Sequence, residues 1–317
     1  MLPGVSFAVT PADAREARER IAGQLPPTPV LPLRGLGWLL AKHEGFQPVG
    51  AFKARGALNA LLALRPRGVV TASSGNHGQA VAWAASLLGI PATVVMPEGS
   101  SEYKRAATLR HGARIVDAPR GTADRNAMAA EIAARDGVTF IAPYDHPLVI
   151  AGQGTAGLEL AEQVPDLTRV LVPLGGGGLL SGMALTLRDQ LGAGVRIIGV
   201  EPEDGDDTVR SIAAGEIVSV PPPRTICDGA RTQSPGELTF PIVRELVDDV
   251  ISITDAEVVD AVRRLAGAGL VVEPTGALGV AAALRLGLER APGPTVCVIT
   301  GINIDPGEHA RLVLGEG

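Results

Sequence analysis

Cysteine is scarce in this chain of 317 residues. The two cysteines, Cys227 and Cys297, form no CxxC pair and no metal-ligand spacing with the five histidines. Neither a disulfide framework nor a zinc site is therefore expected, and reduced thiols in the cytoplasm are the better prediction. The amino terminus has no basic segment followed by an apolar one, so no secretory signal is expected. No apolar run approaches the roughly 18 residues that would span a bilayer.

An excess of positive charge is also lacking, since the formal net charge is −6 and the pI is about 5.5. A mildly acidic surface attracts neither nucleic acid nor an anionic membrane, so a small-molecule ligand is expected. Hydrophobic residues make up 46% of the chain, with 40 glycines and 25 prolines, which is typical of a globular protein with many turns. Its length allows about two domains.

The sequence does contain a regular alternation of short apolar runs with Ala/Leu/Arg-rich helical stretches. This alternation predicts an α/β fold with parallel sheets covered on both faces. One complete series occupies 67–144, and we expect it to form a small domain inserted in a large domain built from 1–66 and 145–317. The predicted strands are GVVTAS, ATVVMP, ARIVDA, VTFIAP, RVLVPL, RIIGVEP and TVCVIT.

Ligands of such folds bind at the carboxyl ends of the strands, and three of these ends are polar or glycine-rich. In TASSGNHGQA, a polar turn precedes a helix. Hydroxyls and amides at a helix N-terminus can hold a carboxylate or phosphate, although a simple N-cap fits this stretch equally well. The residues of this turn are Ser73, Ser74, Gly75, Asn76 and His77.

The second strand end, VLVPLGGGGLLSG, carries four consecutive glycines, which allow the backbone to wrap around an anion. A dinucleotide-binding unit with Glu201 as its ribose-binding acid is an alternative, but the spacing GxGxxxG does not match that motif. The third end is Thr300, which closes TVCVIT. A threonine at this position is also compatible with a plain strand residue whose hydroxyl bonds to the backbone.

Lys53 lies in GAFKARGALNAL, where on its own it is typical of a solvated surface lysine. A lysine, a serine/asparagine loop, a glycine cradle and a strand-end hydroxyl together could hold an aromatic aldehyde phosphate as a Schiff base. From about Leu31 to Asp305 the chain resembles the fold-type-II pyridoxal-phosphate enzymes of the serine/threonine dehydratase and serine racemase family. The matching stretches are GAFKARGALNAL, SSGNHGQA, YDHPLVIAGQGT, PLGGGGLLSG, GVEPEDGDD, TICDGA and VEPTGALGVAA.

The resemblance implies an α/β architecture of two parallel-sheet domains, similar to tryptophan synthase β, with pyridoxal 5'-phosphate as cofactor. Lys53 would carry the cofactor, with Phe52 against its ring. Asn76 would bond the phenolic oxygen, and Thr300 would face the pyridine nitrogen. The substrate carboxylate would lie on the turn from Ser73 to His77. The phosphate would be bound by the backbone of Gly175, Gly176, Gly177, Gly178 and Leu179.

The activity implied is β-elimination from serine, threonine, 3-hydroxyaspartate or a bulkier analogue, giving a 2-oxo acid and ammonia. A neutral hydroxyl at the ring nitrogen makes a weaker electron sink, which favours elimination over a long-lived carbanion. An amino-acid racemase is the alternative, with Ser74 as the acid or base on the second face. A non-catalytic relative that binds pyridoxal phosphate or an amino acid stays open as well. A homodimer is also expected.

Two further sites follow from the resemblance. Arg125 is aligned near a substrate-facing arginine of the racemases and could bind a distal carboxylate of the substrate. An ordinary surface arginine also fits the pattern. Glu201, the Gly205 carbonyl and Asp207 have the spacing of a Mg²⁺ or Ca²⁺ site, against an ordinary acidic loop. The chain departs from the family pattern at four positions, which leaves its substrate specificity open. These are Ala51, Ala142, Thr300 and Ile302.

Overall fold

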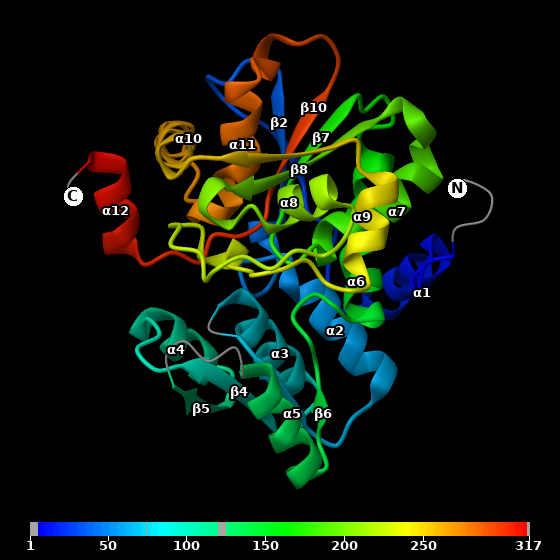
Figure 1. The fold of residues 1–317 in the computed structure, drawn as a ribbon, viewed down its shortest axis with the longest axis vertical. Coiled ribbons are helices and arrows are strands. Elements are labelled where there is room, and N and C mark those ends of the chain that lie inside the picture. Colours follow the sequence, from blue (N-terminus) through cyan, green and yellow to red (C-terminus); the bar gives the residue numbers. More distant parts are fainter. Residues whose placement is uncertain (1–5, 74, 120–124, 316–317) are drawn as a thin grey trace.

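The computed structural model describes residues 6–73, 75–119 and 125–315, and the described residues form two parallel-rich sheets with helices around them (Figure 1). The larger sheet has the strand order β1-β2-β10-β7-β8-β9, in which only β1 and β2 pair antiparallel. Its strands are β1 (Val30–Pro32), β2 (Leu39–His43), β7 (Arg169–Pro173), β8 (Arg196–Pro202), β9 (Asp249–Ile253) and β10 (Thr295–Ile299).

The smaller sheet is parallel throughout, with the order β5-β4-β3-β6. It is formed by β3 (Val69–Ala72), β4 (Ala92–Pro97), β5 (Arg114–Ala118) and β6 (Thr139–Phe140). These strands lie inside the predicted range 67–144, while the division into domains itself stays a prediction. The α/β fold class is confirmed, and each predicted strand segment contains a strand.

Helices cover both faces of the larger sheet. On one face α6 (Pro147–Gln163), α7 (Gly178–Leu191) and α9 (Thr239–Leu246) enclose a core of aliphatic side chains. On the other face α11 (Pro274–Arg285) packs on the strands and α10 (Asp255–Gly267) packs on α11. The remaining helices are α1 (Pro11–Ile21), α2 (Lys53–Leu64), α3 (Asn76–Leu87), α4 (Glu102–Leu109), α5 (Arg125–Asp136), α8 (Asp207–Ala214) and α12 (Pro306–Leu314).

Three strands of the larger sheet, β1, β2 and β9, were not predicted. β2 has the sequence LLAKH, in which a lysine and a histidine interrupt the apolar pattern. Lys42 is nevertheless fully buried, because its Nζ donates to Glu159 Oε2 on α6 at 2.6 Å. Only a partner far along the chain makes this charged residue compatible with a buried strand, and a local pattern carries no sign of that partner.

A buried ion network fixes the helix that begins at Lys53. Arg55 Nε donates to Glu44 Oε2 at 2.7 Å, and Arg55 Nη1 donates to Glu159 Oε1 at 2.6 Å. Lys42 joins through the same Glu159, so two buried cations face two buried carboxylates. Such a balanced group tolerates burial only when each charge is paired and hydrogen-bonded. The first turn of α2 is thereby held to α6 and to the residue that follows β2.

Residues at the carboxyl ends of β3, β7 and β10 line one cavity, and the carboxyl ends of parallel strands are where such sheets bind ligands. Among the described residues, no helix combines the length and the hydropathy that crossing a membrane requires. Both cysteines are free and buried.

Candidate active site

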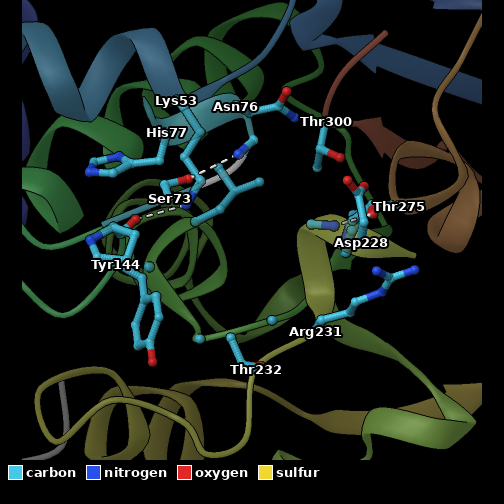
Figure 2. A pocket seen from close by; sticks show the side chains of 18 of the residues that line it. Lys53, Ser73, Asn76, His77, Tyr144, Asp228, Arg231, Thr232, Thr275 and Thr300 are labelled. Atoms are coloured by element: carbon cyan, nitrogen blue, oxygen red, sulfur yellow. Dashed lines mark hydrogen bonds between the residues drawn. The ribbon is translucent and has the colours of Figure 1, made fainter. Parts of the chain in front are cut away.

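Lys53 is brought to the end of strand β10 by backbone pairing. The Phe52 N–H donates to the Thr300 carbonyl at 3.0 Å, and Ala51 forms an isolated antiparallel bridge with Gly301. Helix α2 begins directly afterwards, at Lys53. Two of the predicted positions, far apart in sequence, therefore line one cavity, together with the serine/asparagine turn and the four glycines (Figure 2).

The chain contains three lysines, and Lys53 differs from the other two in having no carboxylate partner among the described residues. Lys42 is paired with Glu159, and Lys104 is paired with Asp228. The Lys53 Nζ donates to the carbonyl of Pro143 at 2.8 Å. Burial lowers its pKa to about 8, so about a tenth of the amine is neutral at pH 7, far more than for an ordinary lysine. A neutral amine is the form that attacks an aldehyde, and this lysine fits that role.

The four glycines form a tight turn between β7 and α7. Gly177 has a φ of +92°, a conformation that favours glycine. A Cβ on Gly176 would collide with the ring of Tyr144, and one on Gly178 would lie 3.1 Å from the Tyr144 backbone. Amides at the start of a helix attract anions, and a side chain at Gly176 would displace Tyr144, so the glycines fit a turn that leaves room for a phosphate. The aromatic neighbour Tyr144 was not predicted.

Thr300 follows β10 and lines the cavity with its hydroxyl. The side chain is 2% exposed, and its Oγ1 has no hydrogen-bond partner among the described residues. An unpaired buried hydroxyl is costly, and native structures rarely leave one without a ligand. This orphaned oxygen and the glycine cradle fit the nitrogen and the phosphate of pyridoxal phosphate, respectively.

We expect Thr300→Val to raise the thermal stability of the apoprotein and to lower its affinity for the cofactor. Valine has the same shape and removes the unpaired hydroxyl, so thermal unfolding of the apoprotein should occur about 1–3 °C higher. The cofactor would lose its partner at the ring nitrogen, and its dissociation constant should rise about tenfold. Titration of the apoprotein with pyridoxal phosphate measures the second effect. An unchanged dissociation constant would remove Thr300 from the cofactor site.

Asn76, the first residue of α3, is fixed on both sides of its amide. Its Nδ2 donates to Glu273 Oε1 at 2.7 Å, and its Oδ1 accepts from Asn303 Nδ2 at 2.8 Å. One N–H of Asn76 stays available for a cofactor oxygen. Glu273 is buried, which raises its pKa to about 7. Glu273 was not assigned a role from the sequence, although it lies within the matching stretch VEPTGALGVAA.

The predicted carboxylate-binding turn is described except for Ser74, which lies outside the described residues. The Gly75 N–H donates to Ser73 Oγ at 3.2 Å. His77 is buried, and burial together with the charge of Lys53 lowers its pKa to about 3. Its neutral ring donates from Nε2 to the Ile141 carbonyl at 3.2 Å, so it offers no positive charge to a carboxylate. Binding of a carboxylate here therefore rests on backbone amides and hydroxyls.

The cavity wall contains further polar side chains to which the sequence analysis gave no role. Asp228 and Arg231 come from the stretch around TICDGA, which the family resemblance had marked without assigning residues. Arg125, which was predicted, also lines the cavity. The other unassigned polar residues of the wall are Lys104, Tyr144, Thr232, Glu273 and Thr275.

The residues of the predicted cation site, Glu201, Gly205 and Asp207, do not line the cavity. The carboxylate of Glu201 accepts from the amides of Thr208 and Val209 at 3.1 and 3.0 Å, at the start of α8. Asp207 Oδ1 accepts from Thr232 Oγ1 at 3.3 Å, and its Oδ2 is buried with no partner among the described residues. Within the described ranges, no group of three or more His, Cys, Asp or Glu side chains is arranged to hold a metal.

Comparisons with known proteins agree with this geometry. The profile of a family described as pyridoxal-phosphate dependent enzyme matches residues 21–301. The chain is 48% identical to the L-threo-3-hydroxyaspartate ammonia-lyase of Saccharomyces cerevisiae, over 97% of both chains. It is 44% identical to the serine racemase of Schizosaccharomyces pombe, over 95% of this chain and 96% of the other.

Two solved structures have the same fold over nearly the whole chain. Maize serine racemase has a TM-score of 0.91 at 38% identity and 98% coverage of both chains. The serine racemase of Dictyostelium discoideum has a TM-score of 0.86 at 37% identity, covering 94% of this chain and 99% of the other. The resemblance inferred from the sequence motifs is thus confirmed. The chain belongs to the pyridoxal-phosphate dependent enzymes of fold type II, a family that includes ammonia-lyases and serine racemases.

Proposed function

We propose that the chain is an ammonia-lyase that removes water from a 3-hydroxy amino acid and releases a 2-oxo acid and ammonia. The observation that carries this proposal is the half-buried amine of Lys53, which has no carboxylate partner among the described residues and shares one cavity with the glycine turn and the Thr300 hydroxyl. The names of relatives at 48% and 44% identity, both L-threo-3-hydroxyaspartate ammonia-lyases, support the elimination.

Different residues of the chain are proposed to carry out different steps of the elimination. Bound pyridoxal phosphate supplies an electron sink for the bond that breaks at the α-carbon. Lys53 Nζ, with its pKa of about 8, would take the α-proton as a free amine. Ser73 and the amide of Gly75 hold the substrate carboxylate. The β-hydroxyl would leave with the electrons of its C–O bond and take up one proton to become water, which balances the proton removed from the α-carbon. The enamine product would then hydrolyse to the 2-oxo acid and ammonia.

Among the possible substrates we propose 3-hydroxyaspartate, because the cavity wall carries arginines as well as the cofactor-binding groups. Arg125 begins α5, and burial lowers its pKa while no carboxylate pairs with it among the described residues. A second substrate carboxylate would supply the missing negative charge. The product would then be oxaloacetate.

A 2-oxo-acid assay with serine, threonine and 3-hydroxyaspartate tests this function. We expect ammonia and 2-oxo acid to appear in equal amounts and only with cofactor present, with the highest kcat/KM on 3-hydroxyaspartate. Binding of cofactor without release of ammonia from any of the three would favour the non-catalytic alternative.

Racemisation is proposed as a side reaction, because a serine racemase is 44% identical to this chain and the family resemblance implies Ser74 as the second acid or base. Serine is a weak base unless its surroundings lower its pKa, so elimination should dominate. We expect Ser74→Ala to reduce the ratio of D-isomer to 2-oxo acid formed from an L-substrate by at least about tenfold. Undiminished D-isomer formation in this variant would exclude Ser74 from the reaction, and racemisation faster than elimination would make the racemase the primary function.

A divalent cation at Glu201, the Gly205 carbonyl and Asp207 is proposed as a structural ion. Burial raises the pKa of Glu201 to about 8 and that of Asp207 to about 7, and a cation would neutralise both carboxylates. We expect EDTA to lower the unfolding temperature near pH 8 by a few degrees, and Mg²⁺ or Ca²⁺ to restore it. An unchanged unfolding temperature would argue for an ordinary acidic loop.

We also propose a homodimer in the cytoplasm. The dimer is supported by the large apolar side chains of Trp38 and Phe46, which are 71% and 60% exposed. The cytoplasm is supported by the two cysteines, which are free thiols as in a reducing compartment. Light scattering would give the mass of the assembly directly. A monomer at micromolar concentration would overturn the dimer.

A further inference from the structure

The cavity contains more positive charge than cofactor binding uses. Among the described residues that line it, four are cationic and two are carboxylic. Asp228 is paired with Lys104, and Glu273 accepts from Asn76. Lys53 is assigned to the cofactor. The remaining unbalanced charges belong to Arg125 and Arg231, and a cavity with such an excess attracts an anion in addition to the cofactor phosphate and the α-carboxylate.

These two arginines belong to different units of the fold. Arg125 begins α5, beside the smaller sheet. Arg231 directly follows the short helix η4 (Asp228–Ala230), which belongs to the larger unit. Figure 2 shows Arg231 on the same side of the cavity as Asp228 and Thr275. A ligand group between the two units could therefore contact either Arg125 or Arg231. The hydrogen bonds of each arginine indicate which one is held in a fixed orientation for binding.

Arg231 is held in place by its own backbone surroundings. Its Nε donates to the Thr225 carbonyl at 2.8 Å, while its two terminal nitrogens have no partner among the described residues. Thr225 in turn donates from Oγ1 to Asp255 Oδ1 at 2.5 Å, and the Ile226 amide donates to the same carboxylate at 3.0 Å. The loop that carries Arg231 is thus fixed to the start of α10.

An arginine anchored through Nε presents its two terminal nitrogens in a fixed orientation. That fork matches the two oxygens of a carboxylate, and little side-chain entropy is left to lose on binding. Arg125, by contrast, has no hydrogen bond to another described residue that would fix its guanidinium. Lys104 is a poor candidate, because Asp228 already occupies its ammonium group.

We propose that Arg231 is the residue that selects a dicarboxylic substrate, by pairing with the carboxylate on the β-carbon of a 3-hydroxy amino acid. The proposal rests on the proposed elimination activity. It assigns the selection to the fixed loop after η4, and it gives Arg125 at most a supporting role. Serine and threonine, which lack that carboxylate, would not make this contact.

The test is the ratio of kcat/KM for 3-hydroxyaspartate to kcat/KM for serine. We expect Arg231→Gln to lower this ratio about 10- to 100-fold, mainly through KM, because a charge-assisted pair with the substrate is lost. Arg231→Lys should recover part of it. Arg34→Gln is the matched control, since Arg34 is exposed and does not line the cavity, and it should leave the ratio unchanged.

An equal loss on both substrates in Arg231→Gln would overturn the proposal. A fall of the ratio only in Arg125→Ala would also overturn it and would assign the selection to α5.

A binding measurement separates this proposal from the proposed function. Malonate should raise the unfolding temperature of the holoenzyme more than propionate does at equal concentration, and Arg231→Gln should remove the difference. If neither serine nor 3-hydroxyaspartate yields a 2-oxo acid, the elimination activity is wrong, while the malonate shift still tests Arg231. Equal shifts by malonate and propionate in the unaltered protein would contradict the role of Arg231 independently of turnover.

Discussion

Replacement of Lys53 by alanine is expected to abolish the yellow colour of the purified protein and to reduce 2-oxo acid release by at least about 10³-fold. The size of the loss follows from two roles of one amine, which carries the cofactor and takes the α-proton. Neither Lys42 nor Lys104 can substitute, because each is engaged by a carboxylate. Visible absorbance and the 2-oxo-acid assay measure the two effects.

The same variant should fold normally, which distinguishes lost chemistry from lost structure. The pKa of Lys53 is lowered from 10.5 to about 8 by burial, so the unfolded chain binds more protons than the folded apoprotein between these values. Stability of the unaltered apoprotein should therefore rise with pH across that window, and this increment should be missing in Lys53→Ala. Turnover in the variant comparable to that of the unaltered enzyme would contradict the assignment.

Substitution of Gly177 by alanine should weaken cofactor binding roughly 10- to 100-fold. An alanine at a φ of +92° is strained, and its Cβ would lie 2.8 Å from the Cβ of Thr239. Thr239 also donates from Oγ1 to the Gly176 carbonyl at 2.7 Å, so relief of the clash would disturb the turn itself. Titration of the apoprotein with pyridoxal phosphate gives the dissociation constant.

Gly194→Ala is the control for this change. A Cβ at Gly194 meets no atom within 4 Å, and the residue lies outside the cavity. Its dissociation constant for the cofactor should equal that of the unaltered protein. Equal affinities in Gly177→Ala and Gly194→Ala would show that the turn does not hold the phosphate.

The sequence was sufficient for those parts of the site that are local in the chain. Gly175 to Gly178 and the turn at Asn76 each follow a strand directly, so strand, turn and helix could be predicted together. The hydrogen bond from the Phe52 amide to the Thr300 carbonyl, unlike these turns, is not local in the sequence. It depends on the pairing of segments from opposite ends of the chain, and only the family resemblance had placed Lys53 beside Thr300.

The residues that sequence reasoning missed share a dependence on tertiary structure. Glu273 belongs to the site because its carboxylate accepts a hydrogen bond from Asn76. Asp228 belongs to it because it forms an ion pair with Lys104 of α4. Arg231 is exposed, and what distinguishes it from other exposed arginines is its place in the cavity wall and the Thr225 carbonyl that fixes its Nε. Their segments could be recognised as matching the family, but no local pattern distinguishes a charged side chain in a cavity wall from one on the surface.

Borohydride reduction of the yellow protein, followed by peptide mapping, tests the central claim most directly. Reduction fixes the cofactor to the lysine that carries it, and the chain offers three candidates. We predict that the label appears on the peptide that contains Lys53, at about one cofactor per chain. A label on Lys42 or Lys104, or no label on any lysine, would contradict the account.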